Sequence, residues 1–436
     1  MVGSTLVSAG CVTDLNVGKL GPDALPPGVL DGGLVGPDGG LAEPTDAAVT
    51  AAPPLNLDVL FVIDNSGSMG EKQELLTESF PRYLDELDKL PGGRPNLHLG
   101  VVSTNMGVGL NVITACLGGG DNGRLQNLPR GACDVPTDPW INDVSSADGR
   151  QINYPAGATL AETFACIARL GTTGCALEQP LEAMRAALDG RNPENLGFFR
   201  PDAFLAVVIV TDEDDCSAAD LAMFEPGQTA LSDPLGPLSS FRCTEFGIIC
   251  DGDPIARAPA TYQECESRPD SYLRHPFEYA DFLDATKASP YSVFVGVIAG
   301  TPSPVKVGIA EDGKPELLPS CASDAGTATP AVRLRNFVDE LPGRGTFISI
   351  CRDNLGEAIT FLGAETRRAI LLSPENPPGA IKEATSGCAC VVDDRTQARW
   401  TGLIVVVLAL WPRRRRQITL ARGATGSSLL RMASDK

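Results

Sequence analysis

The stretch Asp58-Val59-Leu60-Phe61-Val62-Ile63-Asp64-Asn65-Ser66-Gly67-Ser68 decides the fold, because an apolar run passes directly into a short polar turn. A continuous apolar run of this length is typical of a strand buried on both faces of a sheet. Residues 71–90 then place apolar side chains at helical spacing, and Pro91-Gly92-Gly93 is expected to end the helix. A strand followed at once by a helix is the repeating unit of an α/β fold.

The same alternation continues along the chain. Further buried strands are predicted at 97–103, 204–210, 291–298 and 346–350, and helices with an apolar stripe at 177–188, 279–288, 331–341 and 354–368. Strands that alternate with helices predict a doubly wound, mainly parallel sheet flanked by helices, as in Rossmann-like folds. We expect one such α/β domain over about residues 57–370.

Two cysteine-rich insertions interrupt this pattern, at about 105–157 and 215–275. Structureless loops of that length are unusual in a compact domain unless disulfides hold them. Ten of the thirteen cysteines lie within the domain, enough for five bridges whose connectivity the sequence leaves open. Proximity in the sequence suggests three pairs: Cys116 with Cys133, Cys166 with Cys175, and Cys321 with Cys351.

The composition excludes several classes of function. Acidic residues outnumber basic ones by 55 to 35, so nucleic acid is not an expected partner. So many cysteines favour an oxidising compartment, and we expect an exported protein. His98 and His275 are the two histidines of the chain, which excludes a multi-histidine zinc site and argues against a Ser-His-Asp triad. His98 lies within a strand pattern and is expected to be a core or rim residue.

Both ends of the chain fall outside the predicted domain. Residues 1–10 look like the tail of a secretion signal, and residues 6–11 resemble a bacterial lipobox, which makes Cys11 a lipidation candidate. The Gly- and Pro-rich remainder of residues 1–56 is expected to be a disordered linker.

The C-terminal region 371–436 is expected to be a flexible tail. Its segment 388–416 holds Cys388-Ala389-Cys390, an apolar run and four arginines, an order that resembles the sorting tails of myxobacterial surface proteins. The apolar run is about half of the roughly 20 residues that a spanning helix needs. Membrane attachment through a lipid and attachment through this tail therefore both stay open, as does a disordered tail.

Asp64, Ser66 and Ser68 follow the first strand, at the edge of the sheet where ligands bind in doubly wound folds. One carboxylate and two hydroxyls are hard oxygen ligands that suit Mg²⁺, Mn²⁺ or Ca²⁺, and Gly67 permits a tight bend between them. A metal held by so few protein charges keeps coordination positions open. The alternative is that these side chains merely cap the following helix.

The spacing Asp-x-Ser-x-Ser resembles the signature of the von Willebrand factor A family. That family completes a metal-ion-dependent adhesion site with a threonine from a second loop and an aspartate from a third. The resemblance assigns the threonine to Gly171-Thr172-Thr173-Gly174, with Thr172 favoured because the family's threonine usually follows the loop glycine, and the aspartate to Asp212. The insertions make the chain look like a bacterial secreted or lipoprotein branch of the family.

Three more acidic residues, Glu213, Asp214 and Asp215, follow the predicted aspartate ligand. We expect them to form a solvated acidic loop beside the site. The alternatives are a second cation site or direct tuning of the first metal.

The resemblance implies a binding module rather than an enzyme. In the family, the metal takes an acidic group of a protein or surface ligand into its vacant coordination position, and Mg²⁺ is the cation expected first, with Mn²⁺ or Ca²⁺ as alternatives. We therefore expect cation-dependent adhesion at a bacterial cell envelope, on the outer membrane, at the cell surface or in the periplasm. A metal-independent structural envelope protein and a metal-assisted hydrolase with Glu213 or Asp214 as base stay open as alternatives. The pattern predicts neither the ligand nor the oligomeric state.

Overall fold

The computed structural model describes residues 55–374, apart from 112, 114–115, 117–118 and 353. All of these belong to the first of the two units into which the chain divides, Met1–Ile381 and Lys382–Lys436. Cys11 and the segment 388–416 lie outside the described residues, so both modes of membrane attachment stay predictions. Of the helices in the described part, none has the length and hydropathy needed to cross a membrane.

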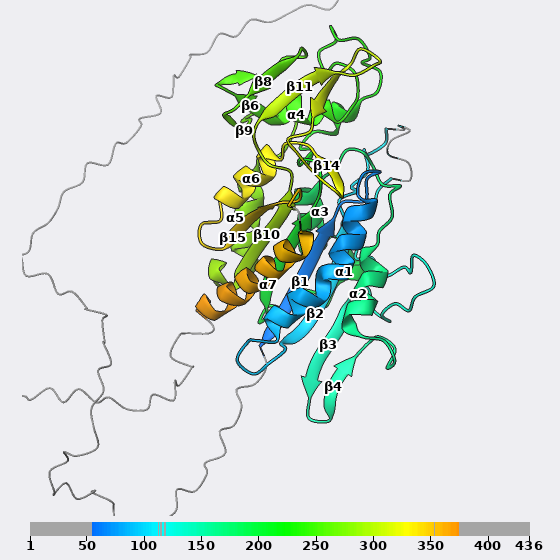
Figure 1. The fold of residues 1–436 in the computed structure, drawn as a ribbon, viewed down its shortest axis with the longest axis vertical. Helices are drawn as coiled ribbons and strands as arrows, with labels where there is room; N and C mark the ends of the chain where they lie inside the picture. Colours follow the sequence, from blue (N-terminus) through cyan, green and yellow to red (C-terminus); the bar gives the residue numbers. More distant parts are fainter. Residues whose placement is uncertain (1–54, 112, 114–115, 117–118, 353, 375–436) are drawn as a thin grey trace, which may run out of the picture. The chain divides into compact units, whose positions relative to one another are not determined.

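A seven-stranded, mostly parallel sheet forms the centre of the domain, with the strand order β15-β10-β5-β1-β2-β3-β4 (Figure 1). Five of its strands correspond to the predicted apolar runs: β1 Asn56–Ile63, β2 Asn96–Ser103, β5 Phe204–Val210, β10 Val293–Ala299 and β15 Gly345–Ser349. β5 and β10 are buried at every residue, as expected of strands covered on both faces. The prediction of an α/β fold with a mainly parallel sheet is confirmed.

Helices pack on both faces of this sheet. The first face carries α1 Gly70–Leu87, α2 Leu160–Ala168 and α7 Leu355–Leu372, and the second carries α3 Pro180–Leu188, α5 Pro276–Thr286 and α6 Val332–Asp339. Successive side chains of a strand point to opposite faces, so Phe61 of β1 joins the first core and Leu60 joins the second.

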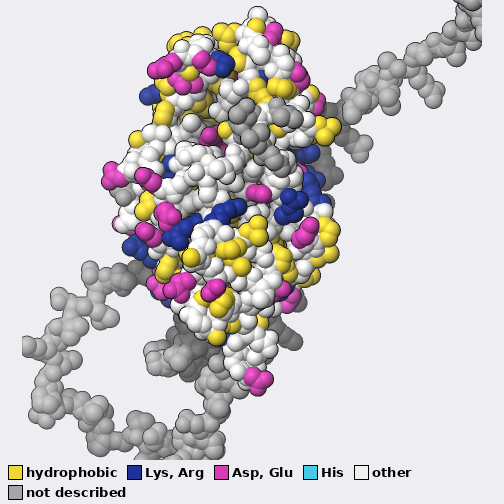
Figure 2. All heavy atoms as spheres, turned by 90° about the vertical axis from the view of Figure 1, so that its right-hand side faces the viewer, with side chains coloured by type: hydrophobic (Ala, Val, Ile, Leu, Met, Phe, Trp, Pro, Cys, Tyr) yellow, Lys and Arg dark blue, Asp and Glu magenta, His cyan; other side chains and the backbone are white. Residues whose placement is uncertain are grey.

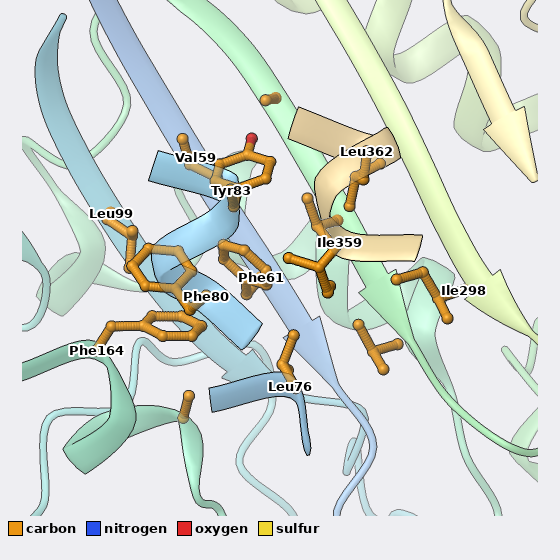
Figure 3. Packing of buried hydrophobic residues seen from close by; sticks show 14 of the residues in the cluster. Val59, Phe61, Leu76, Phe80, Tyr83, Leu99, Phe164, Ile298, Ile359 and Leu362 are labelled. Carbon is orange, nitrogen blue, oxygen red and sulfur yellow. The ribbon is translucent and has the colours of Figure 1, made fainter. Parts of the chain in front are cut away.

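Aromatic side chains fix the position of α1 and α2 on the first face. Phe61, Phe80 of α1 and Phe164 of α2 pack together in Figure 3, and the ring centroids of Phe80 and Phe164 are 3.8 Å apart. Full burial of one such side chain stabilises the fold by roughly 1.5–3 kcal/mol. This packing holds α1 and α2 against the first face of the sheet.

Both insertions contain more structure than the sequence indicated. β3 Ile141–Ser146 and β4 Gly149–Ile152 form an antiparallel hairpin that extends the main sheet beside β2. The second insertion and the residues after β10 form the remaining elements: α4 Phe241–Gly247, β6 Ile248–Cys250, β7 Asp253–Pro254, β8 Ala260–Tyr262, β9 Cys265–Ser267, β11 Val305–Ile309, β12 Pro315–Leu318, β13 Cys321–Ser323 and β14 Gly326–Ala328. Three short 3-10 helices are η1 Pro193–Asn195, η2 Leu221–Phe224 and η3 Pro290–Ser292. The prediction that these stretches are loops is therefore wrong.

The described residues form five disulfides, four of which include a cysteine of an insertion, and two of the three predicted pairs are wrong. The bridges are Cys116–Cys175, Cys133–Cys166, Cys216–Cys243, Cys250–Cys265 and Cys321–Cys351. Cys116 and Cys175 belong to one small apolar cluster, whereas Cys166 lies on α2. The first insertion folds back on itself, so proximity in the sequence does not match proximity in space. Five bridges indicate an extracellular or otherwise oxidising location.

The surface carries both signs of charge on the face drawn in Figure 2. Lys and Arg side chains are interspersed there with Asp and Glu side chains and with apolar ones. Neither sign forms a continuous surface on that face.

Candidate metal centre at the carboxyl ends of β1 and β5

The candidate site lies where two neighbouring parallel strands end. β1 pairs with β5 up to Ile63 and Val210, and the Asp64 N–H donates to the Val210 carbonyl oxygen at 2.9 Å. The residues that follow β5 are Thr211 and Asp212. The topology therefore brings together two polar turns that are almost 150 residues apart in the sequence, at the edge where doubly wound sheets bind ligands.

Asp64 is fully buried and organises the turn. One carboxylate oxygen accepts the Ser66 N–H at 2.7 Å, and the other accepts the Thr211 hydroxyl at 2.6 Å. Burial, and to a smaller extent the nearby Asp212 carboxylate, raise the pKa of Asp64 to about 6.

Ser66, Ser68 and Asp212 complete a continuous set of oxygen atoms. The Ser66 and Ser68 hydroxyl oxygens are 3.3 Å apart, and the Ser68 hydroxyl donates to Oδ1 of Asp212 at 3.0 Å. Ser66 is buried and Ser68 is exposed, so the set opens to solvent on one side. Four of the five predicted ligands thus lie together, and their role as ligands stays a prediction.

The second loop, residues 171–174, is fastened to the same turn. Gln73 of α1 donates through Nε2 to the carbonyl oxygens of Asp64 and Gly171, at 2.8 and 2.9 Å, and accepts the Gly171 N–H. The Gly174 N–H donates to the Asn65 carbonyl oxygen at 2.9 Å.

Thr172 is exposed on this loop, and its methyl carbon would lie 3.3 Å from a β-carbon on Gly70. Among the hydrogen bonds of the described residues, none joins the Thr172 hydroxyl to the other four candidates. The structure therefore brings Thr172 beside the set without linking it to the set.

Lys72 is a member of the site that the sequence analysis missed. Its ammonium nitrogen lies 2.8 Å from Oδ2 of Asp212 and 3.2 Å from the Ser68 carbonyl oxygen. The side chains of Lys72 and Asp212 are each 2% exposed. Lysine is rarely fully buried unless it is paired. The sequence feature that could have identified Lys72 is its position in the first turn of the helix that follows Ser68.

Two further carboxyl groups lie close to this pair. Burial raises the pKa values of Glu178 and Glu213 well above the usual range, and the charges of Asp64 and Asp212 raise both further. Of all basic residues in the described part, Lys72 alone forms an ion pair with any of these four carboxyl groups. Four acids and one ammonium cannot all carry their charge in this confined place, so the acids either bind protons, as their raised pKa values indicate, or need a cation to offset their charge.

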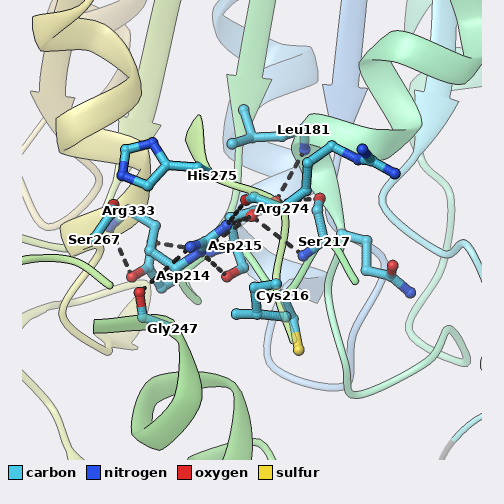
Figure 4. Close-up of polar contacts among 12 residues, drawn as sticks. Leu181, Asp214, Asp215, Cys216, Ser217, Gly247, Ser267, Arg274, His275 and Arg333 are labelled. Carbon is cyan, nitrogen blue, oxygen red and sulfur yellow. Dashed lines mark hydrogen bonds and ion pairs between the residues drawn. The ribbon is translucent and has the colours of Figure 1, made fainter. Parts of the chain in front are cut away.

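The loop after Asp212 is not the solvated acidic loop that the sequence suggested. Asp215 is fully buried and pairs with Arg333 of α6 at 2.9 Å, as Figure 4 shows, and Asp214 accepts the N–H groups of Arg333 and Leu334. The Asp214 carboxylate stabilises the first turn of α6, where N–H groups lack partners within the helix, and Asp215 binds the Arg333 guanidinium. These contacts anchor the segment that carries Asp212.

The donor chemistry fits a hard divalent cation. Asp64, Asp212 and the two serine hydroxyls are oxygen ligands of the kind that Mg²⁺ and Ca²⁺ prefer. Within residues 55–374 as described, no three His, Cys, Asp or Glu side chains are grouped to hold a metal ion, and the candidate set contains two carboxylates with hydroxyls as the rest. His98 lies near the amino end of β2, far along the strand from this edge, with Nδ1 2.8 Å from the Phe198 carbonyl oxygen.

Comparisons with known proteins do not assign the chain to a family. No protein-family model and no curated protein matches it. Among solved structures, it is similar to proximal thread matrix protein 1 from the mussel byssus, with 10% identity, a TM-score of 0.32, and coverage of 72% of this chain and 49% of the other. It is also similar to the pilus adhesin SpaC from Lactobacillus rhamnosus GG, with 10% identity, a TM-score of 0.33, and coverage of 73% and 31%. The pilus adhesin RrgA from Streptococcus pneumoniae is similar with 10% identity, a TM-score of 0.30, and coverage of 72% of this chain and 44% of the other. The chain thus spans less than half of the length of each, and the interpretation of the site rests on its own geometry.

Proposed function

We propose that the chain is an exported adhesion module of the von Willebrand factor A type, which binds an acidic group of a protein or surface ligand through Mg²⁺. The observation that carries the proposal is the meeting of Asp64, Ser66 and Ser68 with Asp212 at the ends of β1 and β5. These four residues and Thr172 would hold the cation. The bound cation would supply an open coordination position for a carboxylate oxygen of the partner.

Three features support binding rather than catalysis. The donor set opens to solvent at Ser68, where a partner can approach. Asp214, a candidate base for hydrolysis, already accepts N–H groups at the start of α6. Glu213 is half-buried, and burial together with the charges of Asp64 and Asp212 raises its pKa well above the usual range. The five disulfides support a place at the cell envelope, on the outer membrane, at the cell surface or in the periplasm.

The experiment uses the full chain loaded with Mn²⁺ and follows the relaxation rate of water protons. Nα-acetyl-aspartate methylamide should lower the relaxation enhancement, because its carboxylate replaces a coordinated water molecule. The matched amide, Nα-acetyl-asparagine methylamide, should leave the enhancement unchanged, and excess EDTA should abolish the effect. Equal responses to the two compounds would contradict the proposal.

A further inference from the structure

A small hollow adjoins the candidate metal centre on the side of the second insertion. It has a volume of about 170 Å³ and lies between the residues after β5, the start of α4, and β12. Its acidic lining consists of Glu178, Glu213, Asp214 and Glu316. Thr329 also lines it and donates its N–H to the Asp212 carbonyl oxygen at 2.9 Å, so the hollow and the candidate metal centre share a wall.

The three glutamates of this hollow have no ion-pair partner among the described residues. Within the described part of the chain, Glu178, Glu213 and Glu316 form no ion pair, while Asp214 is bonded to the N–H groups at the start of α6. Glu178 is 1% exposed, and its Oε2 accepts the Thr104 hydroxyl. Its Oε1 is buried without a hydrogen-bond partner. A buried oxygen without a donor is rare in folded proteins and indicates a missing partner.

The rest of the lining is partly apolar and partly formed by the hydroxyl residues Ser240, Thr244 and Thr329. The disulfide Cys216–Cys243 lines it with both cysteines buried, and Leu317 lies beside Glu316. Figure 4 shows Cys216 next to Asp214 on the loop after β5. Acidic groups beside apolar walls suit a basic side chain, whose alkyl stem packs on apolar surface while its charged end is paired.

The size of the hollow and the spacing of its acids favour an organic cation over a metal ion. A bound divalent cation needs several oxygens at about 2.0–2.6 Å. The described residues contain no three acidic side chains grouped in that way. A guanidinium or ammonium group is larger and donates several hydrogen bonds over a wider spread.

We propose that this hollow binds the cationic end of a Lys or Arg side chain of a protein partner, with Glu178 and Glu316 as its acceptors. The proposal goes beyond the metal-dependent adhesion described above and does not depend on it. A partner that uses both sites would carry a basic residue close to the acidic residue that reaches the cation.

The test uses saturation-transfer NMR on the full chain in EDTA, with Nα-acetyl-arginine methylamide and Nα-acetyl-lysine methylamide as probes. The neutral analogue Nα-acetyl-citrulline methylamide is the control. We expect binding of at least one cationic probe and none of the citrulline compound. Glu316→Gln should raise the Kd of the probe at least about fivefold. Glu311→Gln, an exposed acid in the same β11–β12 hairpin that does not line the hollow, should not change it.

Equal signals from the arginine and citrulline probes would overturn the proposal, as would an unchanged Kd of the cationic probe in Glu316→Gln. A Mg²⁺ stoichiometry that falls by one in Glu316→Gln would also overturn it, because the hollow would then be a metal site. Asp64→Ala should retain probe binding. Probe binding by a chain that binds no Mg²⁺ would therefore refute the proposed adhesion function and leave this inference standing.

Discussion

The ammonium nitrogen of Lys72 lies 2.8 Å from Oδ2 of Asp212, and both side chains are almost completely buried. The carboxylate proposed to hold a divalent cation therefore already has a positive partner from the protein itself. Because the Ser68 hydroxyl occupies the other oxygen, Oδ1, both ends of this carboxylate are engaged. The ion pair offsets part of the negative charge of the site and opposes the entry of a second cation.

Replacing Lys72 with Met should tighten Mg²⁺ binding at least about tenfold, or about 1.4 kcal/mol, because a positive charge next to the cation is removed. In EDTA the same variant should lose about 3–5 kcal/mol of unfolding free energy, since the buried Asp212 carboxylate is left without its cationic partner. Calorimetric titration with Mg²⁺ and urea unfolding measure the two effects. Lys89→Met, which removes an exposed lysine near the end of α1, is the control. Weaker Mg²⁺ binding in Lys72→Met would show that the ammonium orients the ligands instead of opposing the cation.

The neighbouring threonines Thr172 and Thr173 offer a matched pair of substitutions on one loop. Thr172→Ala should weaken Mg²⁺ binding about tenfold, since Thr172 lies against the start of α1 beside the donor set and the substitution removes one of the five proposed oxygen ligands. Thr173→Ala should leave the Kd within about twofold. The same calorimetric titration decides between them, and a larger effect of Thr173→Ala would transfer the predicted ligand to that residue.

Asp58 gives a pH dependence that is separate from the metal centre. It is buried on β1 and accepts hydrogen bonds from Nε and the backbone N–H of Arg200 at 2.7 and 2.6 Å. Burial raises its pKa from 3.8 to about 6, although Arg200 acts in the opposite direction. A carboxyl group whose pKa is raised on folding stabilises the native state below its unfolded pKa, and this contribution is lost as the pH rises through the folded pKa.

The unfolding free energy of the wild type relative to Asp58→Asn should therefore decline between about pH 4 and pH 7. The total decline should be on the order of 3 kcal/mol, from a shift of about two pKa units. Urea unfolding of both proteins in EDTA at several pH values measures it. An advantage of the wild type that grows with pH would mean that the Arg200 ion pair outweighs the cost of burial.

The main sheet could be predicted because its strands are apolar runs, and most of its helices because each carries an apolar stripe. β5 is buried at every residue and therefore reads as a continuous apolar run, and a helix with one buried face reads as an apolar stripe. β4 could not be predicted in this way, because it is exposed at every residue and pairs with only one neighbour. The start of β10 was placed too early by two residues because η3 occupies Pro290–Ser292.

The candidate site shows a similar limit. Asp64, Ser66 and Ser68 could be proposed from the sequence because their spacing is local, and Asp212 from its place after an apolar strand. Lys72 and Glu178 could not be proposed, because their roles depend on contacts that are distant in the sequence. Lys72 contacts Asp212, which is 140 positions later, and Glu178 contacts Thr104, which is 74 positions earlier. The pairing of Cys116 with Cys175 is non-local in the same sense.

The binding of Mg²⁺ to the full chain, measured by calorimetry, tests the central claim most directly. Wild type and Asp85→Ala, which changes an exposed acid on α1, should each bind Mg²⁺ with the same Kd. Asp64→Ala and the isosteric Asp64→Asn should lose measurable binding, because the buried carboxylate at the centre of the donor set is gone. Retention of Mg²⁺ binding with an unchanged Kd in both Asp64 variants would contradict the account.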